Sequence, residues 1–274
     1  MSKTLGVWDS AGPRWQDPAT LAELERLGYG TLWFGGSPPD LTTVEPALAA
    51  STSLSVATGI VNVWDGPVDT AAYSYLTRAY PGRFVLGLGV GHRKFVGDTY
   101  TRPLDRMVSC LDDLDAAGVP AAGRVLAALG PKMLGLARDR TAGAHPYLVT
   151  PEHTAQAREI LGEGKWLAPE QKVVLSTDPD EARAIARRTL AMYLELPNYT
   201  NSWLRLGFTE ADLAGGGSDR LVDALVAWGD VDAIRERVGA HWEAGADHVA
   251  LQVLNADKMA VLRALAPVLA GASF

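Results

Sequence analysis

His92 is the side chain in this sequence best suited to moving a proton. Its unperturbed pKa of about 6.5 lies near working pH, so a histidine here can act as a general acid or base. It follows the apolar, glycine-rich run 84–91, which is typical of a buried parallel strand. Ligands of parallel sheets bind at the carboxyl ends of the strands, which makes His92 a candidate proton donor. Arg93 and Lys94 come next, so a basic surface cluster is an equally open interpretation.

Glycines near two strand ends predict space for a flat ring. Gly59 lies within the apolar run 55–64, where a glycine marks either a packing position or the close approach of a ligand. Residues 87–91 read Gly-Leu-Gly-Val-Gly. They are not a dinucleotide fingerprint, because that motif opens a helix and needs an acidic residue about 20 positions further on. We interpret them as small residues that leave room above the sheet.

The segment Leu129–Met133 is a candidate anion-binding turn. It joins a predicted strand to a predicted helix, where free N–H groups attract anions and Gly130 allows close approach. Pro131 takes the first helical position, which needs no donor, and Lys132 adds positive charge. A plain turn is the alternative interpretation. His153, near the start of a later helix, is a weaker phosphate candidate.

Other polar and aromatic residues fall at the same predicted rim. Asp9 follows the first strand, Gly35 the second and Trp64 the third. Trp64 could stack on a ring or pack in the core, and Asp9 could simply stabilise its loop. No spacing of His, Cys, Asp or Glu indicates a metal site, and neither a Gly-x-Ser-x-Gly elbow nor a phosphate loop is present.

The candidate residues can form one site only if the fold brings the ends of several strands together. The sequence predicts strands and helices that alternate along the chain. The predicted strands are Thr4–Trp8, Thr31–Phe34, Ser55–Val63, Phe84–Val90, Arg124–Leu129, Ala144–Val149, Lys172–Ser176 and Asp247–Leu254. The predicted helices are Pro18–Leu27, Val44–Ala50, Val68–Ala79, Pro103–Ala117, Pro131–Arg138, Pro151–Leu161, Asp178–Glu195, Asp230–Ala244 and Asp257–Leu269. Eight strands in this order favour a closed (β/α)8 TIM barrel over an open sheet.

One stretch is left over, at approximately 197–228, between the seventh and eighth strands. It is too long for a simple connection and too apolar for a disordered linker. We predict a helical insertion over the barrel mouth. With no linker in sight, residues 1–274 are predicted to form one domain.

Composition narrows the class of protein. The chain has 274 residues, 47% of them hydrophobic, and a net charge of −7 without a basic stripe, so nucleic acid is not an expected partner. No apolar run is long enough to span a membrane, and no signal peptide is evident. Cys110 is the only cysteine, which suits a reducing compartment. We expect a cytoplasmic protein that acts on small molecules.

Four segments resemble a known family. They are residues 56–64, 83–92, 147–154 and 244–252, spread in order over most of the chain. Together they resemble the luciferase-like flavin and deazaflavin oxidoreductases, the bacterial luciferase superfamily, and most of all its actinobacterial coenzyme F420-dependent oxidoreductases. The motifs are specific for the superfamily and less so for the cofactor.

The resemblance implies a cofactor site. In F420-using relatives a non-proline cis peptide in the third strand backs the deazaflavin ring, and the matching bond is Gly59–Ile60. The fourth-strand glycines match the segment beneath the cofactor, and the turn from Gly130 matches a phosphate contact. The implied cofactor-binding residues are Gly35, Gly59, Ile60, Val61, Asn62, Gly89, Gly91, Leu129, Gly130, Pro131, Lys132, Met133 and His153.

The sequence also departs from some relatives. Sugar-phosphate dehydrogenases of this superfamily carry an acidic residue and a histidine where Gly35 and Gly36 stand, and a glutamate where His92 stands. Their reaction is therefore not transferred to this chain. We predict catalytic roles for His92 first and for Asp9 and Asn62 second. Substrate contacts are predicted for Trp64, Tyr199 and Trp203.

The predicted function is hydride transfer between F420 and a small organic substrate with an activated C=C, C=O or imine. An FMN-dependent luciferase-like monooxygenase is the first alternative, and a non-catalytic F420-binding barrel is the second. Barrel relatives often pair as homodimers, although no surface stripe of this sequence establishes a dimer.

Overall fold

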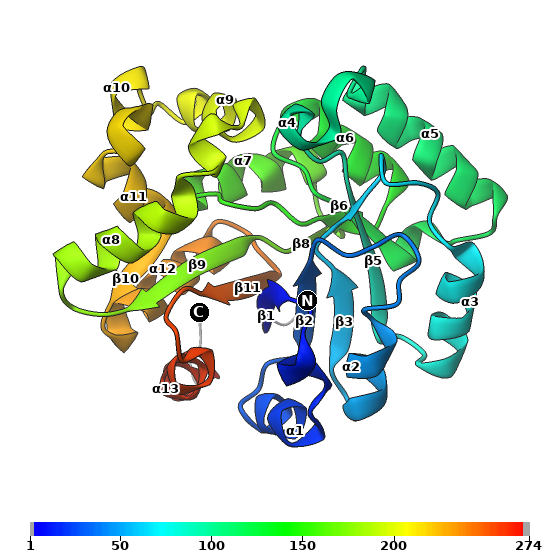
Figure 1. The fold of residues 1–274 in the computed structure, drawn as a ribbon, viewed down its shortest axis with the longest axis horizontal. Coiled ribbons are helices and arrows are strands. Elements are labelled where there is room, and N and C mark those ends of the chain that lie inside the picture. Colours follow the sequence, from blue (N-terminus) through cyan, green and yellow to red (C-terminus); the bar gives the residue numbers. More distant parts are fainter. Residues whose placement is uncertain (1–2, 271–274) are drawn as a thin grey trace.

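Parallel strands form the centre of the molecule (Figure 1). The computed structural model describes residues 3–270. Neighbouring strands within one continuous sheet are β1 (Thr4–Ser10), β2 (Thr31–Gly35), β3 (Ser55–Thr58), β5 (Phe84–Gly89), β6 (Arg124–Leu126), β7 (Gly143–Ala144) and β8 (Trp166–Leu167). Each pairing between them is parallel. On its other edge, β1 pairs with β11 (His248–Val253).

The sheet closes on itself through the segment 166–175. Its first part, β8, pairs with β7, and its second part, β9 (Glu170–Leu175), pairs with β11. Only Ala168 and Pro169 separate the two parts, so one strand of the barrel contacts both neighbours. The predicted α/β fold with a parallel TIM barrel is confirmed, with the seventh strand starting earlier than Lys172.

The third strand is interrupted. It was predicted as Ser55–Val63, but β3 ends at Thr58 and a short β4 (Val61–Asn62) pairs separately with β5. Between them lies Gly59–Ile60, whose peptide bond is cis, as the family resemblance implied.

Two other strands are shorter than predicted. β6 ends at Leu126, although Ala127 still donates its N–H to Leu88 O at 2.8 Å. β7 ends at Ala144 because Pro146 carries no N–H for a ladder and Leu148 adopts a positive φ of 54°. The chain beyond each strand therefore runs as irregular backbone at the barrel's carboxyl end.

Every predicted helix is present, with ends shifted by a few residues. They are α1 (Pro18–Arg26), α2 (Glu45–Ala50), α3 (Thr70–Ala79), α5 (Pro103–Ala116), α6 (Pro131–Arg140), α7 (Pro151–Leu161), α8 (Pro179–Leu190), α12 (Val231–Glu243) and α13 (Lys258–Ala270). Side chains of Asp17, Asp69, Thr150, Asp178 and Asp230 accept N–H groups at five of their N-termini. The predicted helix Asp178–Glu195 is two elements in the structure. The α-helix α8 ends at Leu190, and a separate 3₁₀ turn, η4 (Tyr193–Glu195), follows it.

Short helices that the sequence did not predict lie in the connections. They are α4 (Arg93–Val96), η1 (Pro13–Gln16), η2 (Gly97–Thr99) and η3 (Ala121–Gly123). Of these, α4 matters most for function because it begins directly after His92.

The insertion is helical except at its end. It contains α9 (Pro197–Arg205), α10 (Glu210–Leu213), η5 (Ala214–Gly216) and α11 (Asp219–Leu225). Its last residues were predicted to be part of a helical insertion, but they form β10 (Val226–Gly229), a parallel strand on the flank of β9 away from β11. This short, continuous apolar run forms a strand because the edge of β9 offers it hydrogen bonds.

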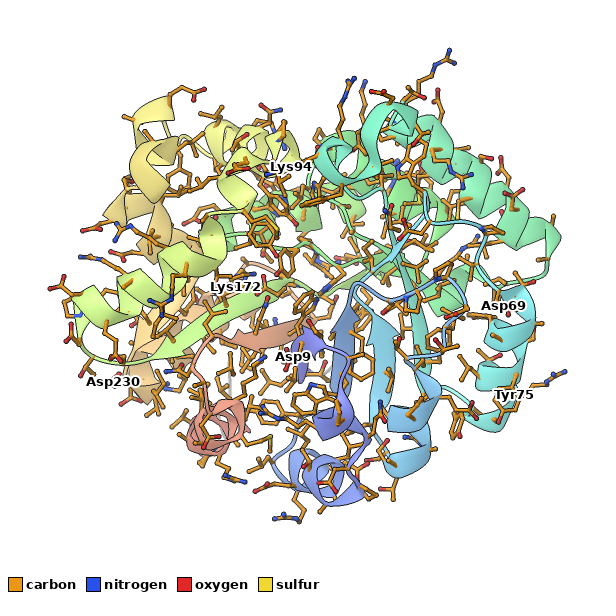
Figure 2. All side chains as sticks on the ribbon, viewed as in Figure 1. Asp9, Asp69, Tyr75, Lys94, Lys172 and Asp230 are labelled. Carbon is orange, nitrogen blue, oxygen red and sulfur yellow. The ribbon has the colours of Figure 1, made fainter. Side chains whose placement is uncertain are left out.

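Large rings fill the barrel interior. Trp33 is fully buried and stacks on His145 with ring centroids 3.9 Å apart, while its Nε1 donates to His248 Nε2 at 3.1 Å. Small residues such as Ala57 and Ala250 surround it and leave the space that the indole needs. Figure 2 shows Lys172 within the barrel, whereas Asp69, Tyr75 and Asp230 lie at the periphery. The rings make a floor, and the space above it is open.

Candidate active site

A cavity of about 860 Å³ lies above this floor, at the carboxyl ends of the strands. Cavities of this size hold drug-sized ligands and organic cofactors. It takes lining residues from the ends of β3 to β7 and from α4, α9 and η4. Twelve of the predicted site residues line it, namely Gly59, Ile60, Asn62, Gly89, Gly91, His92, Leu129, Gly130, Pro131, Lys132, Met133 and Tyr199.

Backbone and small residues make one side of the cavity, which we call the glycine wall (Gly59, Ile60, Gly89 and Gly91). A β-carbon on Gly89 would lie 2.6 Å from the Ile60 side chain, so a larger residue there would displace Ile60. Gly91 has a φ of 56°, the left-handed region, and packs against Asn62. Three of the four residues of the wall therefore carry no side chain, which leaves room for a planar ligand.

Trp8 explains two of the predicted glycines. A β-carbon on Gly35 would collide with the Trp8 ring, and one on Gly59 would lie 2.7 Å from Trp8 Nε1. Gly35, predicted to bind the cofactor, thus makes room for an indole of the protein itself. Trp8 lines the cavity, and its Nε1 has no hydrogen-bond partner within residues 3–270. Sequence reasoning placed Trp8 in a strand and missed it as a site residue.

His92 lies half-buried at the cavity edge as the N-cap residue of α4. Its ring contacts Tyr199 with centroids 5.3 Å apart, and its Nδ1 finds no partner among the described residues. Burial lowers the pKa of His92, so the imidazole is neutral near pH 7. Lys94 points elsewhere and pairs with Glu195 of η4. His92 thus lines the cavity apart from the surface pair of Lys94 and Glu195, and its role in proton transfer stays a prediction.

The predicted anion turn lies in the cavity at the N-terminus of α6. Gly130 is the N-cap residue and offers no side chain, so the first N–H groups of a ten-residue helix point toward the cavity end. Arg205 of α9 comes close, its Nη2 lying 3.9 Å from where a Gly130 β-carbon would be. Together with Lys132 it makes this end of the cavity positive. Arg205 carries no local sequence signal, because only the fold brings 205 to 130.

His153 supports this turn from behind. It is buried, and its Nε2 lies 2.9 Å from Leu129 O, so that nitrogen carries the proton and donates it. The residue is outside the cavity lining, so the structure gives the predicted phosphate contact by His153 no support.

Two further residues of the predicted cofactor and catalytic sets have structural roles. Asp9 pairs with Lys258 and accepts from Trp15 Nε1 at 3.2 Å, which ties β1 to the following loop and to α13. Val61 is completely buried in the main core. Neither lines the cavity, so the structure gives no support to the catalytic prediction for Asp9 or to the contact prediction for Val61.

Two of the predicted substrate residues also lie outside the cavity lining. Trp64 donates from Nε1 to Val90 O at 2.9 Å and packs against Tyr100. Trp203 is fully buried and donates to Leu148 O at 3.1 Å, which anchors α9. Both large rings found packing partners within the protein, and only Tyr199 of the three lines the cavity.

A second side of the cavity, the tyrosine wall, consists of Tyr147, Tyr193 and Tyr199. Their ring centroids lie 5.1 to 6.2 Å apart in tilted or edge-to-face contacts. Tyr147 also contacts Trp8 at 5.0 Å, which joins the two walls. Burial raises the pKa of all three phenols, so they are neutral hydroxyls. The sequence analysis quoted Tyr147 within a motif but gave it no role, and it missed Tyr193.

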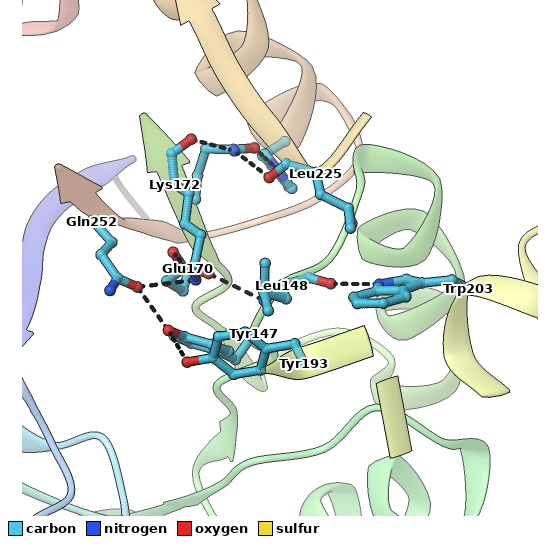
Figure 3. Close-up of polar contacts among 10 residues, drawn as sticks. Tyr147, Leu148, Glu170, Lys172, Tyr193, Trp203, Leu225 and Gln252 are labelled. Carbon is cyan, nitrogen blue, oxygen red and sulfur yellow. Dashed lines mark hydrogen bonds and ion pairs between the residues drawn. The ribbon is translucent and has the colours of Figure 1, made fainter. Parts of the chain in front are cut away.

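Behind the tyrosine wall lies a buried ion pair (Figure 3). Lys172 Nζ and Glu170 Oε1 of β9 are 3.1 Å apart, and both side chains are fully buried. Burial lowers the pKa of Lys172 to about 8, and burial raises the pKa of Glu170. The ammonium lies 3.7 Å from the centroid of the Tyr147 ring. Nothing in the run Glu170-Gln-Lys172 signalled an interior pair rather than an exposed one.

His145 lies at the cavity floor. Its Nδ1 donates to Ala168 O at 2.6 Å, and burial lowers its pKa to about 4. The ring is therefore neutral, with its proton on Nδ1. Its Nε2 has no partner in the part of the chain that the structure describes.

Residues 3–270 offer neither a metal site nor a membrane span. No cluster of three or more His, Cys, Asp or Glu side chains could hold a metal ion there. No helix in that range is both long and apolar enough to cross a membrane.

The described chain is thus a parallel α/β barrel with one large cavity at the carboxyl ends of its strands. Residues 3–117 match the family model described as luciferase-like monooxygenase. The predicted resemblance to the luciferase-like oxidoreductases is thereby confirmed. No curated protein sequence matches the chain.

Solved structures share the fold over nearly the whole chain. One is an F420-dependent secondary alcohol dehydrogenase in complex with an F420-acetone adduct, with 13% identity, a TM-score of 0.73, and 98% and 99% of the two chains covered. Another is the coenzyme F420-dependent tetrahydromethanopterin reductase from Methanopyrus kandleri, with 13% identity, a TM-score of 0.69, and 97% and 98% covered. A third is the oxygenating constituent of 3,6-diketocamphane monooxygenase from Pseudomonas putida in complex with FMN, with 13% identity, a TM-score of 0.67, and 97% and 96% covered. At these identities the likeness establishes the fold.

Proposed function

We propose that this protein is an F420-dependent oxidoreductase that transfers a hydride between the deazaflavin and a small organic substrate. The substrate would carry an activated C=C, C=O or imine. The observation that carries the proposal is the joint placement of the glycine wall and the positive turn at Gly130 in one cavity of about 860 Å³. Similar structures that use F420 support it.

The residues present fit such a cofactor. A tricyclic ring needs a flat surface, and the glycine wall has no side chain larger than Ile60. A phosphate needs N–H donors and positive charge, and the N-terminus of α6 with Lys132 and Arg205 has both. When bound, F420 would supply two-electron hydride chemistry. The protein's own contribution is to place the reactants, exclude water and manage a proton.

His92 is the residue that we propose for the proton. As a neutral imidazole it can give a proton from one nitrogen and accept one at the other. Asn62 lines the same region, but its amide already donates to Asp65 Oδ1 at 3.2 Å and its oxygen accepts from Trp64 N at 3.3 Å. We therefore propose that Asn62 shapes the turn around the ring rather than moving protons.

A titration with each cofactor tests the proposal. Purified protein is titrated with F420 and with FMN, and binding is followed by fluorescence anisotropy. Binding of F420, followed by turnover on a panel of enones, imines and alcohols, is the expected result. Tight FMN binding without F420 binding would instead support the luciferase-like monooxygenase, which the matching family model and the FMN-bound relative favour. Binding of F420 without turnover on any substrate would support the non-catalytic barrel.

A variant at Arg205 tests the phosphate end. Arg205→Ala should weaken binding of the phosphate-bearing cofactor by about tenfold, the effect of losing one charge-assisted hydrogen bond. Its phosphate-free ribityl form should bind within about twofold of wild type. Arg188→Ala, an exposed arginine on α8, is the matched control. Equal losses for both forms would show that Arg205 does not meet the phosphate.

A further inference from the structure

A directed chain of hydrogen bonds runs from the buried ion pair to the cavity (Figure 3). Lys172 Nζ donates to Gln252 Oε1 at 3.0 Å, and the same oxygen lies 2.8 Å from the Tyr147 hydroxyl. Tyr147 and Tyr193 join their hydroxyls at 2.9 Å. Tyr193 and Tyr147 line the cavity, while Lys172 lies wholly inside the protein.

The ammonium sets the direction of this chain. Lys172 uses its three hydrogens on Glu170, on Gln252 and on the face of the Tyr147 ring. An ammonium only donates, so the Gln252 atom that faces it must be the oxygen and not the amide nitrogen. The other Glu170 oxygen accepts Leu148 N–H at 3.1 Å, so the carboxylate is held as well.

Each following hydroxyl then has one available orientation. Gln252 Oε1 carries no hydrogen, so Tyr147 must donate to it. Because a phenol has a single hydrogen, Tyr147 can only accept from Tyr193. The one hydrogen of Tyr193 is thereby used inside the protein, and its oxygen has only lone pairs left to offer.

We propose that Tyr193 is an enforced hydrogen-bond acceptor in the cavity and selects a ligand that presents an O–H or N–H donor there. The proposal rests on the proposed function for the role of the cavity. In an alcohol and ketone pair, the alcohol carries the donor and the ketone does not. Tyr193 therefore favours the reduced, hydroxyl-bearing member of such a pair, or an N–H on the edge of the cofactor ring. Tyr147, Gln252 and Lys172 act as positioning residues.

Two binding comparisons distinguish a donor on the substrate from a donor on the cofactor ring. The first compares cyclohexanol with cyclohexanone, on the protein alone and on the protein saturated with whichever cofactor binds, by ligand-observed NMR. The second compares FMN with its N3-methyl analogue. We expect wild type to prefer the donor-bearing partner by about tenfold in one of the two, and Tyr193→Phe to remove that preference. The comparison that shows the preference identifies the source of the donor. No preference in either, or a preference that survives in Tyr193→Phe, would overturn the proposal.

A second variant tests the orientation separately from Tyr193. In Lys172→Met combined with Glu170→Gln, no charge remains buried, Gln252 is free to turn its amide, and both hydroxyls can reverse. The donor preference should fall to about twofold or less although Tyr193 is retained. If it stays near tenfold in a folded double variant, the ammonium does not orient the chain. Gln252→Leu removes the same anchor and replaces the double variant if that protein does not fold.

A matched control accounts for loss of a buried phenol. Tyr29 donates to Leu262 O at 2.9 Å, away from the cavity, and Tyr29→Phe should keep the full donor preference despite some loss of stability. If neither F420 nor FMN binds, the proposed function fails. The alcohol and ketone comparison on the protein alone still decides the role of Tyr193.

Discussion

The glycine wall and the tyrosine wall line the same cavity but offer a ligand different things. Along the glycine wall, side chains are absent at Gly59, Gly89 and Gly91, and the ligand would meet backbone. Along the tyrosine wall, three aromatic rings line the cavity, and the Tyr147 hydroxyl is connected through Gln252 to a fully buried ion pair. The first suits a flat ring of any polarity, whereas the second discriminates between hydrogen-bonding patterns.

Substitutions in the two walls should have different effects on stability and on ligand binding. The glycine wall consists of neighbouring strands, so its shape follows from local backbone geometry. The tyrosine wall depends on residues more than 100 positions apart, such as Tyr147 and Gln252. Substitutions in the tyrosine wall should therefore lower the stability of the whole barrel. Substitutions in the glycine wall should mainly weaken ligand binding.

The largest expected effect comes from breaking the ion pair. Lys172→Met leaves the Glu170 carboxylate buried without its cation, which should lower the free energy of unfolding by roughly 3–5 kcal/mol. Urea denaturation measures the loss. The double variant with Glu170→Gln carries no buried charge and should recover most of it. A single variant as stable as wild type would contradict the view that this wall supports the barrel.

The pH dependence of stability tests the burial of two histidines, His145 and His248, in the barrel interior below both walls. Burial lowers the pKa of His145 to about 4 and of His248 to about 3, below the value near 6.5 in an unfolded chain. The unfolded chain therefore binds more protons below pH 6.5, and stability should fall as the pH drops from about 6.5 toward 4. Each histidine contributes up to about 1.4 kcal/mol per pH unit.

The variant His145→Gln isolates the contribution of His145 to this pH dependence. Its unfolding free energy should depend less steeply on pH between 6.5 and 4 than that of wild type. The measurement is a set of urea denaturation curves across this interval. An unchanged slope would mean that His145 is not buried as a neutral ring.

An intermediate effect is expected at the glycine wall. The β-carbon of Gly59→Val would press on Trp8 Nε1 and push the indole toward the cavity. Cofactor binding, measured by anisotropy, should weaken by at least about tenfold, more than the fall in melting temperature would suggest. Gly12→Val is the control, because a β-carbon there meets nothing within 4 Å and its φ of −174° suits any residue. Unchanged binding in Gly59→Val would remove the third strand from the site.

The smallest effect concerns the contact across the cavity mouth. Lys94 of α4 pairs with Glu195 of η4, and their side chains are 47% and 63% exposed. Solvent screens such a pair, so a double-mutant cycle with Lys94→Ala and Glu195→Ala should give a coupling below about 1 kcal/mol. A larger coupling would mean that the two sides of the mouth are held together more firmly than their exposure indicates.

Much of the barrel could be predicted because its signals are local. Three helices begin where they were predicted, after Asp17, Thr150 and at Asp178, whose side chains cap them in the structure, and the apolar runs placed the strands of the first half. The second half was harder, since Pro146 shortened one strand and Trp166 to Leu175 carried a polar-looking sequence in a buried strand. Polar residues there are buried only because they satisfy one another.

The same limit separates the predicted site residues that line the cavity from those that do not. Gly59 and Gly89 lie within predicted strands, His92 and the turn at Gly130 come just after predicted strands, and all of them line the cavity. The direction of a large aromatic side chain was harder to predict, because a tryptophan at a strand end packs into the nearest available space. Trp64 turned away to Val90 and Trp8 turned in over Gly59.

By itself, the order of apolar runs, caps and glycines in this chain determined a parallel barrel with an open, flat-walled end. These features act over a few residues through backbone geometry and hydrogen bonds, so they can be recognised without the fold. Only the tertiary structure decided which polar groups meet inside it, including Lys172 with Tyr147 and Arg205 with the Gly130 turn. Such contacts depend on distances between residues far apart in sequence, and the folded barrel alone sets those distances.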